Sequence, residues 1–406
     1  MNVKSQPESD PNIPLDQRPL PQRFPEYCQK IQLQYPIKPR HRWDIENLFK
    51  RCSGLGSEYH IFDKIGEGTF STVYKAVDLK HFMFDNSYWD FDFASEEDTG
   101  NAFIRPPPKF VAIKKIYVTS SCNRIENEIS ILHQLVGNQY VTPLITATRF
   151  DDQVLLVLPF FRHVDFREYF QTLPLIDIKY YMFSLFQALS HCHRHKIIHR
   201  DVKPSNFLYL NSKRRGVLVD FGLAQREEPP TQEIPEFLHT KAHSFFDANG
   251  SPGIIKNDTR PTIKANRAGT RGFRAPEVLL KCRYQTVSID VWSAGVILLC
   301  FMSRRFPFFN SASDHEALIE LACIFGKTEM QKVSTELNRV FHTNIPSIRE
   351  AQITFPTLCK NLNPEGVGMF PPEAFDLLEK CLALNPKNRI TADQALLHPF
   401  LAGLTQ

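Results

Sequence analysis

The stretch that decides the fold is His199-Arg200-Asp201-Val202-Lys203-Pro204-Ser205-Asn206, followed by Asp220-Phe221-Gly222. It combines the carboxylate of Asp201, the ammonium group of Lys203 and the amide of Asn206 in a fixed order. These groups suit the transfer of a phosphoryl group to a hydroxyl, because that reaction places its charge on oxygens and depends on positioning and neutralisation. Each residue alone would be an ordinary polar loop residue, but their joint spacing indicates a catalytic loop.

Four polar residues of this stretch have predicted roles. Asp201 is expected to accept or orient the proton of the substrate hydroxyl, and Lys203 to neutralise the γ-phosphate of ATP. Asn206 and Asp220 are the predicted Mg²⁺ ligands, because this hard cation prefers amide and carboxylate oxygens. The cofactors predicted from this stretch are therefore ATP and Mg²⁺.

The catalytic stretch resembles that of eukaryotic protein kinases, and Val111-Ala112-Ile113-Lys114 resembles their strand with the phosphate-binding lysine. Side chains alternate along a strand, so Lys114 is expected to face the nucleotide and Lys115 the opposite side. Glu126 and Glu128 are candidates to hold Lys114. Glu128 is preferred because it borders the apolar face of a helix expected over 123–136, while Glu126 would pair with a capping Asn123.

A glycine loop is expected between strands over 59–65 and 71–77. Gly66 and Gly68 are followed by Ser71, where a kinase loop usually has a third glycine, so this signal is weak alone. The resemblance assigns the loop to the phosphates, Leu158 to the gatekeeper position and 159–161 to the hinge. The residues that it places at the nucleotide are Ile65, Gly66, Glu67, Gly68, Thr69, Phe70, Ser71, Val73, Ala112, Lys114, Glu128, Leu158, Pro159, Phe160, Phe161, Leu208 and Asp220.

A second loop, Gly269 to Glu277, resembles the substrate-binding segment of kinases that ends in Ala-Pro-Glu. The resemblance implies that Thr270 bonds the catalytic aspartate and lysine, which is typical of Ser/Thr kinases. It also implies that Asp290 anchors the catalytic loop and that Arg389 pairs with Glu277.

The order of patterns along the 406 residues predicts a two-lobed α+β kinase fold. Strands with one helix come first, then a hinge, then mostly helices. The expected kinase domain spans 41–402, with an N-lobe over about 59–158 and a C-lobe over about 162–402. Residues 1–40 are expected to be a disordered arm, before a short helix that contains Trp43, Ile45, Leu48, Phe49 and Cys52. Insertions are expected over about 79–109, 226–265 and 336–370.

Composition excludes some other classes of protein. The net charge is only +4, and Lys213-Arg214-Arg215 is one short basic turn, so direct nucleic-acid binding is not expected. The nine cysteines form no Cys-x-x-Cys pair, and the histidines of 191–195 lack regular ligand spacing, which disfavours a zinc site. The N-terminus has no signal-peptide pattern and no apolar run is long enough to cross a bilayer. A soluble protein in a reducing compartment is expected.

Three segments narrow the resemblance: Gly66–Ser71, His199–Tyr209 and Arg267–Glu277. Together they resemble the fungal type of the cell-division-cycle kinase that fires replication origins, the catalytic subunit of DDK. The resemblance implies a nuclear Ser/Thr kinase that needs a DDK regulatory subunit and phosphorylates acidic sites on the minichromosome-maintenance helicase to start DNA replication. Arg271 and Arg274 are the expected contacts for acidic substrates, because guanidinium groups pair well with carboxylates.

Other interpretations stay open from sequence alone. A pseudokinase scaffold would bind nucleotide or partners without chemistry, but the polar catalytic set is intact. Another cell-cycle or casein-type Ser/Thr kinase would lack the Arg267–Glu277 string and would act without the regulatory subunit. Several arginines could instead form internal ion pairs or a helix cap, namely Arg271, Arg274, Arg304 and Arg305.

Overall fold

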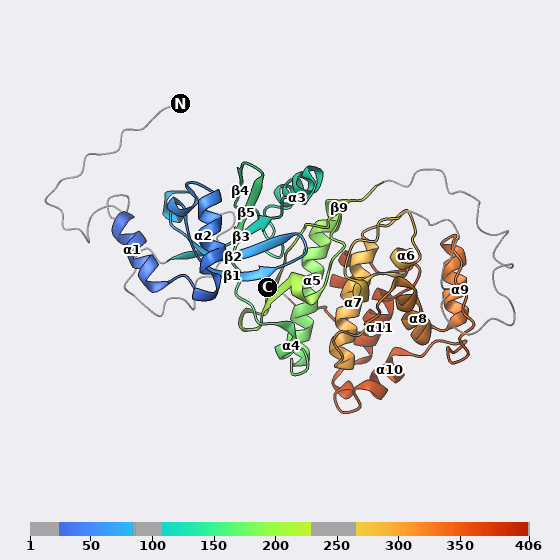
Figure 1. Ribbon diagram of the computed structural model, residues 1–406. Coiled ribbons are helices and arrows are strands. Elements are labelled where there is room, and N and C mark those ends of the chain that lie inside the picture. Colours follow the sequence, from blue (N-terminus) through green and yellow to red (C-terminus); the bar gives the residue numbers. More distant parts are fainter. Residues whose placement is uncertain (1–23, 85, 87–107, 229–264, 405–406) are drawn as a thin grey trace. The chain divides into compact units, whose positions relative to one another are not determined.

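The structure is a computed structural model, and it describes residues 24–84, 86, 108–228 and 265–404 (Figure 1). The chain divides into two compact units, Met1–Cys122 with Pro143–Phe161 and Asn123–Thr142 with Arg162–Gln406. Helix α3 (Cys122–Gln134) thus clusters with the second unit, whereas the sequence placed it in the first lobe.

The first unit is built on a five-stranded antiparallel sheet with the strand order β1-β2-β3-β5-β4. Its strands are β1 (Tyr59–Glu67), β2 (Ser71–Asp78), β3 (Lys109–Ile116), β4 (Thr146–Phe150) and β5 (Gln153–Pro159). They are rich in β-branched and aromatic residues, which fit a pleated surface. Strands β1, β2 and β3 lie where the sequence predicted them.

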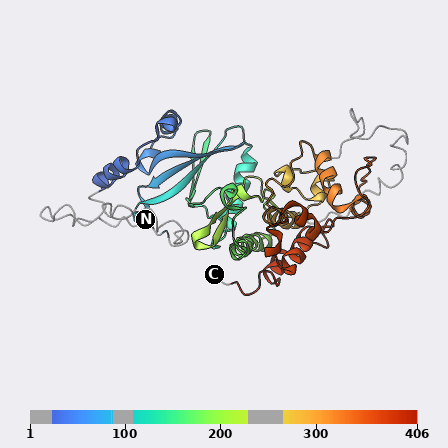
Figure 2. The same cartoon turned by 90° about the horizontal axis from the view of Figure 1, so that it is seen from below.

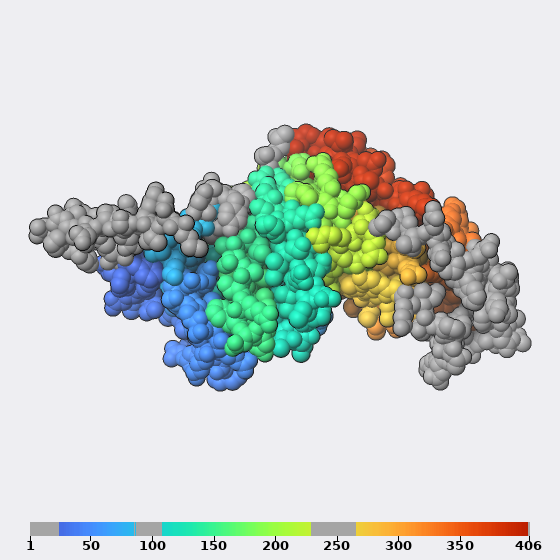
Figure 3. Space-filling view, turned by 90° about the horizontal axis from the view of Figure 1, so that it is seen from above, coloured from blue at the N-terminus to red at the C-terminus, as the bar shows by residue number. Residues whose placement is uncertain are grey.

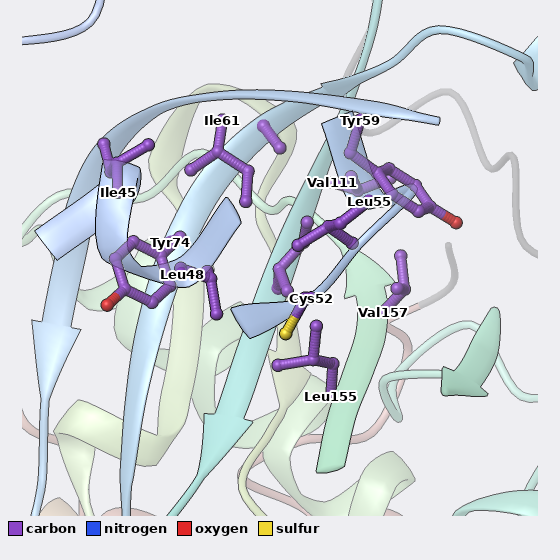
Figure 4. Close-up of a cluster of buried hydrophobic side chains, with 12 residues drawn as sticks. Ile45, Leu48, Cys52, Leu55, Tyr59, Ile61, Tyr74, Val111, Leu155 and Val157 are labelled. Atoms are coloured by element: carbon purple, nitrogen blue, oxygen red, sulfur yellow. The ribbon is translucent and has the colours of Figure 1, made fainter. Parts of the chain in front are cut away.

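One face of this sheet is covered by helix α2 (Arg42–Arg51), whose Ile45 and Leu48 pack on strand residues such as Tyr74 and Val157 (Figure 4). The helix was predicted, but the placement of Trp43 on its buried face is wrong, because 76% of Trp43 is exposed. Trp43 lies two positions from Ile45, and residues two apart on a helix do not share a face.

The opposite face of the sheet receives helix α1 (Phe24–Gln34), shown in blue beside the strands in Figure 2. Tyr27 and Ile31, four positions apart, are its buried residues and pack on Phe62 and Phe110. The prediction of a disordered arm over 1–40 is therefore wrong for residues 24–40. Phe24, Tyr27, Cys28 and Ile31 have the spacing of one helix face, a signal that the prediction missed, and they pack on the sheet.

The second unit is mainly helical. Its helices are α3 (Cys122–Gln134), α4 (Phe166–Tyr169), α5 (Leu175–Arg194), α6 (Pro276–Leu279), α7 (Ser288–Ser303), α8 (Asp314–Phe325), α9 (Lys327–Glu336), α10 (Phe355–Leu362), α11 (Pro372–Cys381) and α12 (Ala392–Leu396). Its short strands are β6 (Ile197–Ile198), β7 (Phe207–Leu210), β8 (Arg215–Leu218) and β9 (Gln225–Arg226). Helix α7 is buried along nearly its whole length, and α12 packs against α5. Figure 3 shows the surface of the C-terminal residues in red.

Three boundaries differ from the predictions. Helix α3 begins at Cys122, so Asn123 lies inside the helix and the capping box proposed for it is wrong. The third insertion, 336–370, contains helix α10, whose Pro356 stands in the first turn, where proline is tolerated. Most of the other two insertions and of the N-terminal arm (87–107, 229–264 and 1–23) lie outside the described residues.

Candidate functional site

Three predicted polar residues, two from the catalytic loop and one from the substrate loop, surround the carboxylate of Asp201. Asp201 Oδ2 lies 2.8 Å from Lys203 Nζ and accepts a hydrogen bond from Asn206 Nδ2 at 3.0 Å. Asp201 Oδ1 accepts from the backbone amide of Thr270 at 2.8 Å and from its hydroxyl at 2.6 Å. Lys203 Nζ also donates to Thr270 Oγ1 at 2.8 Å. The contacts that the kinase resemblance implied for Thr270 are therefore present.

The charge state of Asp201 follows from these contacts. Burial by itself would raise its pKa, but the hydrogen bond and charge of Lys203 and the hydroxyl of Thr270 outweigh burial and hold the pKa below its ordinary value. The carboxylate is therefore ionised across the physiological range. Such a group is a weak base, and it is suited to orienting a hydroxyl whose proton leaves late in a loose transition state.

A fully buried carboxylate on α7 holds the catalytic loop in place. Asp290 accepts the backbone amides of His199 and Arg200, both at 2.8 Å, and lies 3.2 Å from His193 Nε2. Arg200 has a φ of +70°, which a non-glycine residue rarely adopts. The two hydrogen bonds to Asp290 stabilise this strained turn, so the anchoring role predicted for Asp290 is confirmed.

The oxygens predicted for Mg²⁺ suit that cation. Asn206 uses its amide nitrogen toward Asp201, which leaves its carbonyl oxygen as the group to offer a metal. Asp220 follows β8 with a φ of +64° and begins the Asp-Phe-Gly turn. Within the described ranges no group of three or more His, Cys, Asp or Glu side chains is spaced to hold a metal ion. One amide oxygen and one carboxylate are ligands of the kind that Mg²⁺ accepts beside phosphate oxygens and water.

Four of the predicted nucleotide residues of the first unit share one face of the sheet. Val73 pairs with Lys114, and Ala112 pairs with Leu158. Directly paired residues project to the same face, and so do residues two apart along a strand. These four side chains therefore lie on one face, opposite to the face that α2 covers. Lys114 is 6% exposed, and Glu128, on α3 of the second unit, is 5% exposed.

Gly66 lies within β1, where it pairs with Val73 beside a register shift, so only Gly68 lies in the loop between β1 and β2. Neither Gly66 nor Gly68 has a positive φ, and an added Cβ would meet only ordinary contacts, at 3.7 Å from Val73 Cβ and from Ser71 O respectively. Neither the backbone angles nor the packing therefore requires glycine at these two positions. Of the other predicted loop residues, Ile65 and Phe70 are exposed.

The two predicted substrate arginines share an internal carboxylate that the sequence did not reveal. Arg274 Nη1 lies 2.7 Å from Asp314, and the same side chain also bonds the backbone oxygen of Gly269. Arg271 Nε lies 3.6 Å from Asp314, and Arg267 Nη1 lies 3.0 Å from it. Arg274 is therefore largely an internal structural residue, whereas Arg267 and Arg271 are more exposed. Arg304 directly follows α7 with a φ of +52°, in the capping position that the helix-cap interpretation expected.

Other sequence predictions concern structure near the site. Arg389 and Glu277 form a buried bidentate pair at 2.8 and 3.0 Å, as predicted. The basic turn Lys213-Arg214-Arg215 joins β7 to β8 as a hairpin, and Arg214 pairs with Asp177 at 2.7 Å. Two residues were missed: Asp314, the first residue of α8, and Gln285, which accepts from Arg200 and donates to Asn266 O. Their partners lie 19 to 85 positions away, and no local pattern signals such pairing.

The sequence matches one known protein family and several known proteins. Residues 102–401 match the family model described as the protein kinase domain. The chain is 46% identical to the cell cycle serine/threonine-protein kinase hsk1 of Schizosaccharomyces pombe, over 90% of this chain and 76% of that protein. It is 39% identical to the cell cycle protein kinase spo4 of the same species (88% and 89%) and 26% identical to the human cell division cycle 7-related protein kinase (89% and 92%).

The family match fits the fold, in which a five-stranded sheet is followed by a mainly helical unit. No helix among the described residues has the length and apolar character needed to cross a membrane. Protein kinase domains bind ATP and transfer its terminal phosphoryl group. The chain belongs to the protein kinase family and, within it, to the Cdc7/Hsk1 family of cell-cycle serine/threonine kinases.

Proposed function

We propose that Asp201, Lys203, Asn206, Thr270 and Asp220 carry the catalysis of this serine/threonine kinase. The observation that supports this most is the shared carboxylate, since Asp201 contacts Lys203, Asn206 and Thr270 at 2.6 to 3.0 Å. Asp201 orients the substrate hydroxyl toward the γ-phosphate, and Lys203 neutralises charge on the transferred group. Thr270 holds both groups and selects serine and threonine.

The adenine and phosphate contacts are proposed for the first unit. Backbone groups of the hinge 159–161 bond the adenine, Ala112 and Val73 pack on it, and Lys114 binds the phosphates with Glu128 as its carboxylate partner. Asn206 and Asp220 would hold Mg²⁺, which neutralises phosphate charge when it is bound. The common sheet face of Val73, Ala112 and Lys114 supports these roles.

The proposed substrates are serines and threonines in acidic sequence, on the minichromosome-maintenance helicase, in the nucleus at the start of DNA replication. The proposed activator is the DDK regulatory subunit. Support comes from similarity to kinases named for cell division and from a local excess of positive charge. Three arginines, 267, 271 and 274, surround the single carboxylate of Asp314, so Arg267 and Arg271 retain capacity for an acidic peptide.

A kinase assay on the full chain tests these proposals. The substrates are two peptides with the same serine, one with acidic and one with neutral flanks, each with and without the regulatory subunit. Asp201→Asn should lower kcat by at least about 100-fold, because the hydroxyl loses its orienting carboxylate. Activity that survives this substitution would overturn the mechanism.

The same assay separates the competing interpretations. Arg271→Ala should reduce kcat/KM for the acidic peptide more than for the neutral one, and equal losses would contradict the substrate proposal. Full activity without the regulatory subunit would contradict the proposed activator, while the family membership would stand. Binding of ATP without transfer in every combination would favour a pseudokinase scaffold.

A further inference from the structure

The sheet face with the proposed ATP residues does not end at the adenine position. Along β3, Lys114 and Ala112 are followed at the same two-residue spacing by Phe110, and along β2 Val73 is followed by Lys75. Lys75 pairs directly with Ala112, so its side chain lies in the same row as the proposed adenine contact. Phe110 belongs to the cluster that α1 covers.

The ammonium group of Lys75 lies among aromatic rings on this face. Its Nζ is 4.0 Å from the ring centre of Phe160, 4.4 Å from that of Phe110 and 5.8 Å from that of Phe62. All three distances are within the range in which a cation is attracted to the face of a ring. Phe160 is the middle residue of the hinge, and its backbone amide bonds Phe110 O at 3.3 Å.

The end of the α1 segment contacts the same rings. Tyr35, just after the helix, lies with its ring centre 5.3 Å from that of Phe110 at 84° and 5.4 Å from that of Phe62. Phe110 in turn lies 6.5 Å from Phe160 at 63°. These are edge-to-face or tilted arrangements, which aromatic pairs prefer. A continuous chain of ring contacts thus joins the segment after α1 to the hinge.

We propose that Lys75 and Tyr35 are positioning residues for the nucleotide: together with Phe110 they fix Phe160 and thereby the hinge backbone that bonds adenine. Helix α1 is then part of the nucleotide-binding apparatus. The inference rests on the proposed adenine contact at 159–161. The ring contacts restrict the hinge before ATP arrives, so less conformational freedom is lost on binding and affinity rises.

Calorimetric titration of the full chain with ATP and Mg²⁺ tests this without any activator or peptide. Lys75→Met keeps the length of the side chain and removes its charge, and it should raise the Kd for ATP about three- to tenfold, within the range expected for an ammonium group over a ring. Lys75→Arg keeps a cation over the rings and should restore most of the affinity. Tyr35→Leu should raise the Kd by a smaller factor.

Lys80→Met is the matched control, because Lys80 lies in the same unit and contacts Glu58 at 3.4 Å, away from these rings. Its Kd should equal that of the wild type. Thermal unfolding of each variant without ATP identifies a general loss of stability. A higher Kd that accompanies a lower Tm, and that also occurs in Lys80→Met, would overturn the inference.

The remaining outcomes separate this inference from the proposed function. If the wild type binds ATP and Lys75→Met binds it equally well, the positioning role is wrong while the nucleotide site stands. If only Tyr35→Leu has no effect, the role of α1 is overturned. If the wild type itself binds no ATP, the proposed site and the inference fail together.

Discussion

At the residue scale, burial acts differently on two aspartates. Asp201 is buried beside Lys203 and has a lowered pKa, whereas Asp78, at the end of β2, is 7% exposed and its burial raises its pKa to about 6. The amide of Lys80 donates to Asp78 Oδ1 at 2.9 Å, but the charge of Glu58 opposes ionisation further. A buried carboxylate that is paired with a cation is stabilised as an anion. A buried carboxylate without a close cation is destabilised in its ionised form.

We expect Asp78→Asn to stabilise the protein at pH 7.5 by up to about 3 kcal/mol, the equivalent of a pKa shift from the ordinary 3.8 to about 6. The raised pKa means that the folded state binds the proton more tightly, so the wild type gains stability as the pH falls from 7 toward 4. The advantage of the variant should therefore shrink at pH 5. Urea denaturation at both pH values measures this, and an equal difference at both would contradict it.

The polar site residues could be predicted from the sequence because their order along the chain is itself a pattern. Asp201, Lys203 and Asn206 lie within six positions, and their contacts follow from one tight loop. Asp314 could not be predicted, because its three arginine partners lie 40 to 47 positions earlier and only the packing of α8 brings them together. The pairing of Arg274 with Asp314 could not be predicted for the same reason.

At the element scale, hydrophobic periodicity located strands β1 to β3 and helices α2 and α3, and the prediction failed where prolines suggested irregular structure. Helix α1 was missed although its apolar residues have a helical spacing, because prolines and polar residues surround it. Helix α10 was taken for an irregular stretch because of its prolines. Its start is nevertheless marked by Thr354, whose hydroxyl accepts the amide of Thr357, with proline in the first turn. Proline ends a helix only when it lies in the interior.

The turn before Thr270 depends on one glycine. Gly269 has a φ of +107°, and a Cβ there would lie 2.3 Å from the backbone oxygen of Arg200. Gly269→Ala should displace Thr270 from Asp201 and reduce kcat by about 100-fold, the loss expected from a misplacement near 1 Å. The Kd for ATP should change little, since the substitution acts on the catalytic loop. Single-turnover kinetics with the acidic peptide measures the effect.

Gly137→Ala is the control for that substitution. Gly137 has a similar φ of +97°, but an added Cβ there would have no neighbour within 4 Å. It therefore imposes the strain of a positive φ without the clash. Equal losses of kcat in the two variants would show that backbone strain, and not the contact with Arg200, explains the result at Gly269.

At the scale of the whole molecule, the sequence order of strands followed by helices predicted the two units, but the pairs that hold distant segments together appear only in the structure. The resemblance to kinases was needed to predict that Arg389 meets Glu277, 112 positions away. Within the second unit, this pair joins α6, at the end of the substrate loop, to the segment between α11 and α12. Arg389 also bonds Ser288 O at 2.9 Å and Ala383 O at 3.1 Å.

Removing one partner of this pair should cost much more than removing both. The side chains of Arg389 and Glu277 are 0% and 2% exposed, so Arg389→Met leaves a buried carboxylate without its cation and should lower the free energy of unfolding by about 3–5 kcal/mol. Adding Glu277→Gln removes that uncompensated charge and should recover part of the loss. Urea denaturation of the wild type, both single variants and the double variant gives the coupling energy, with Lys380→Met as the exposed-pair control at Asp376. Additive losses would mean that the two charges do not stabilise each other, and the pair would then act only through its backbone contacts.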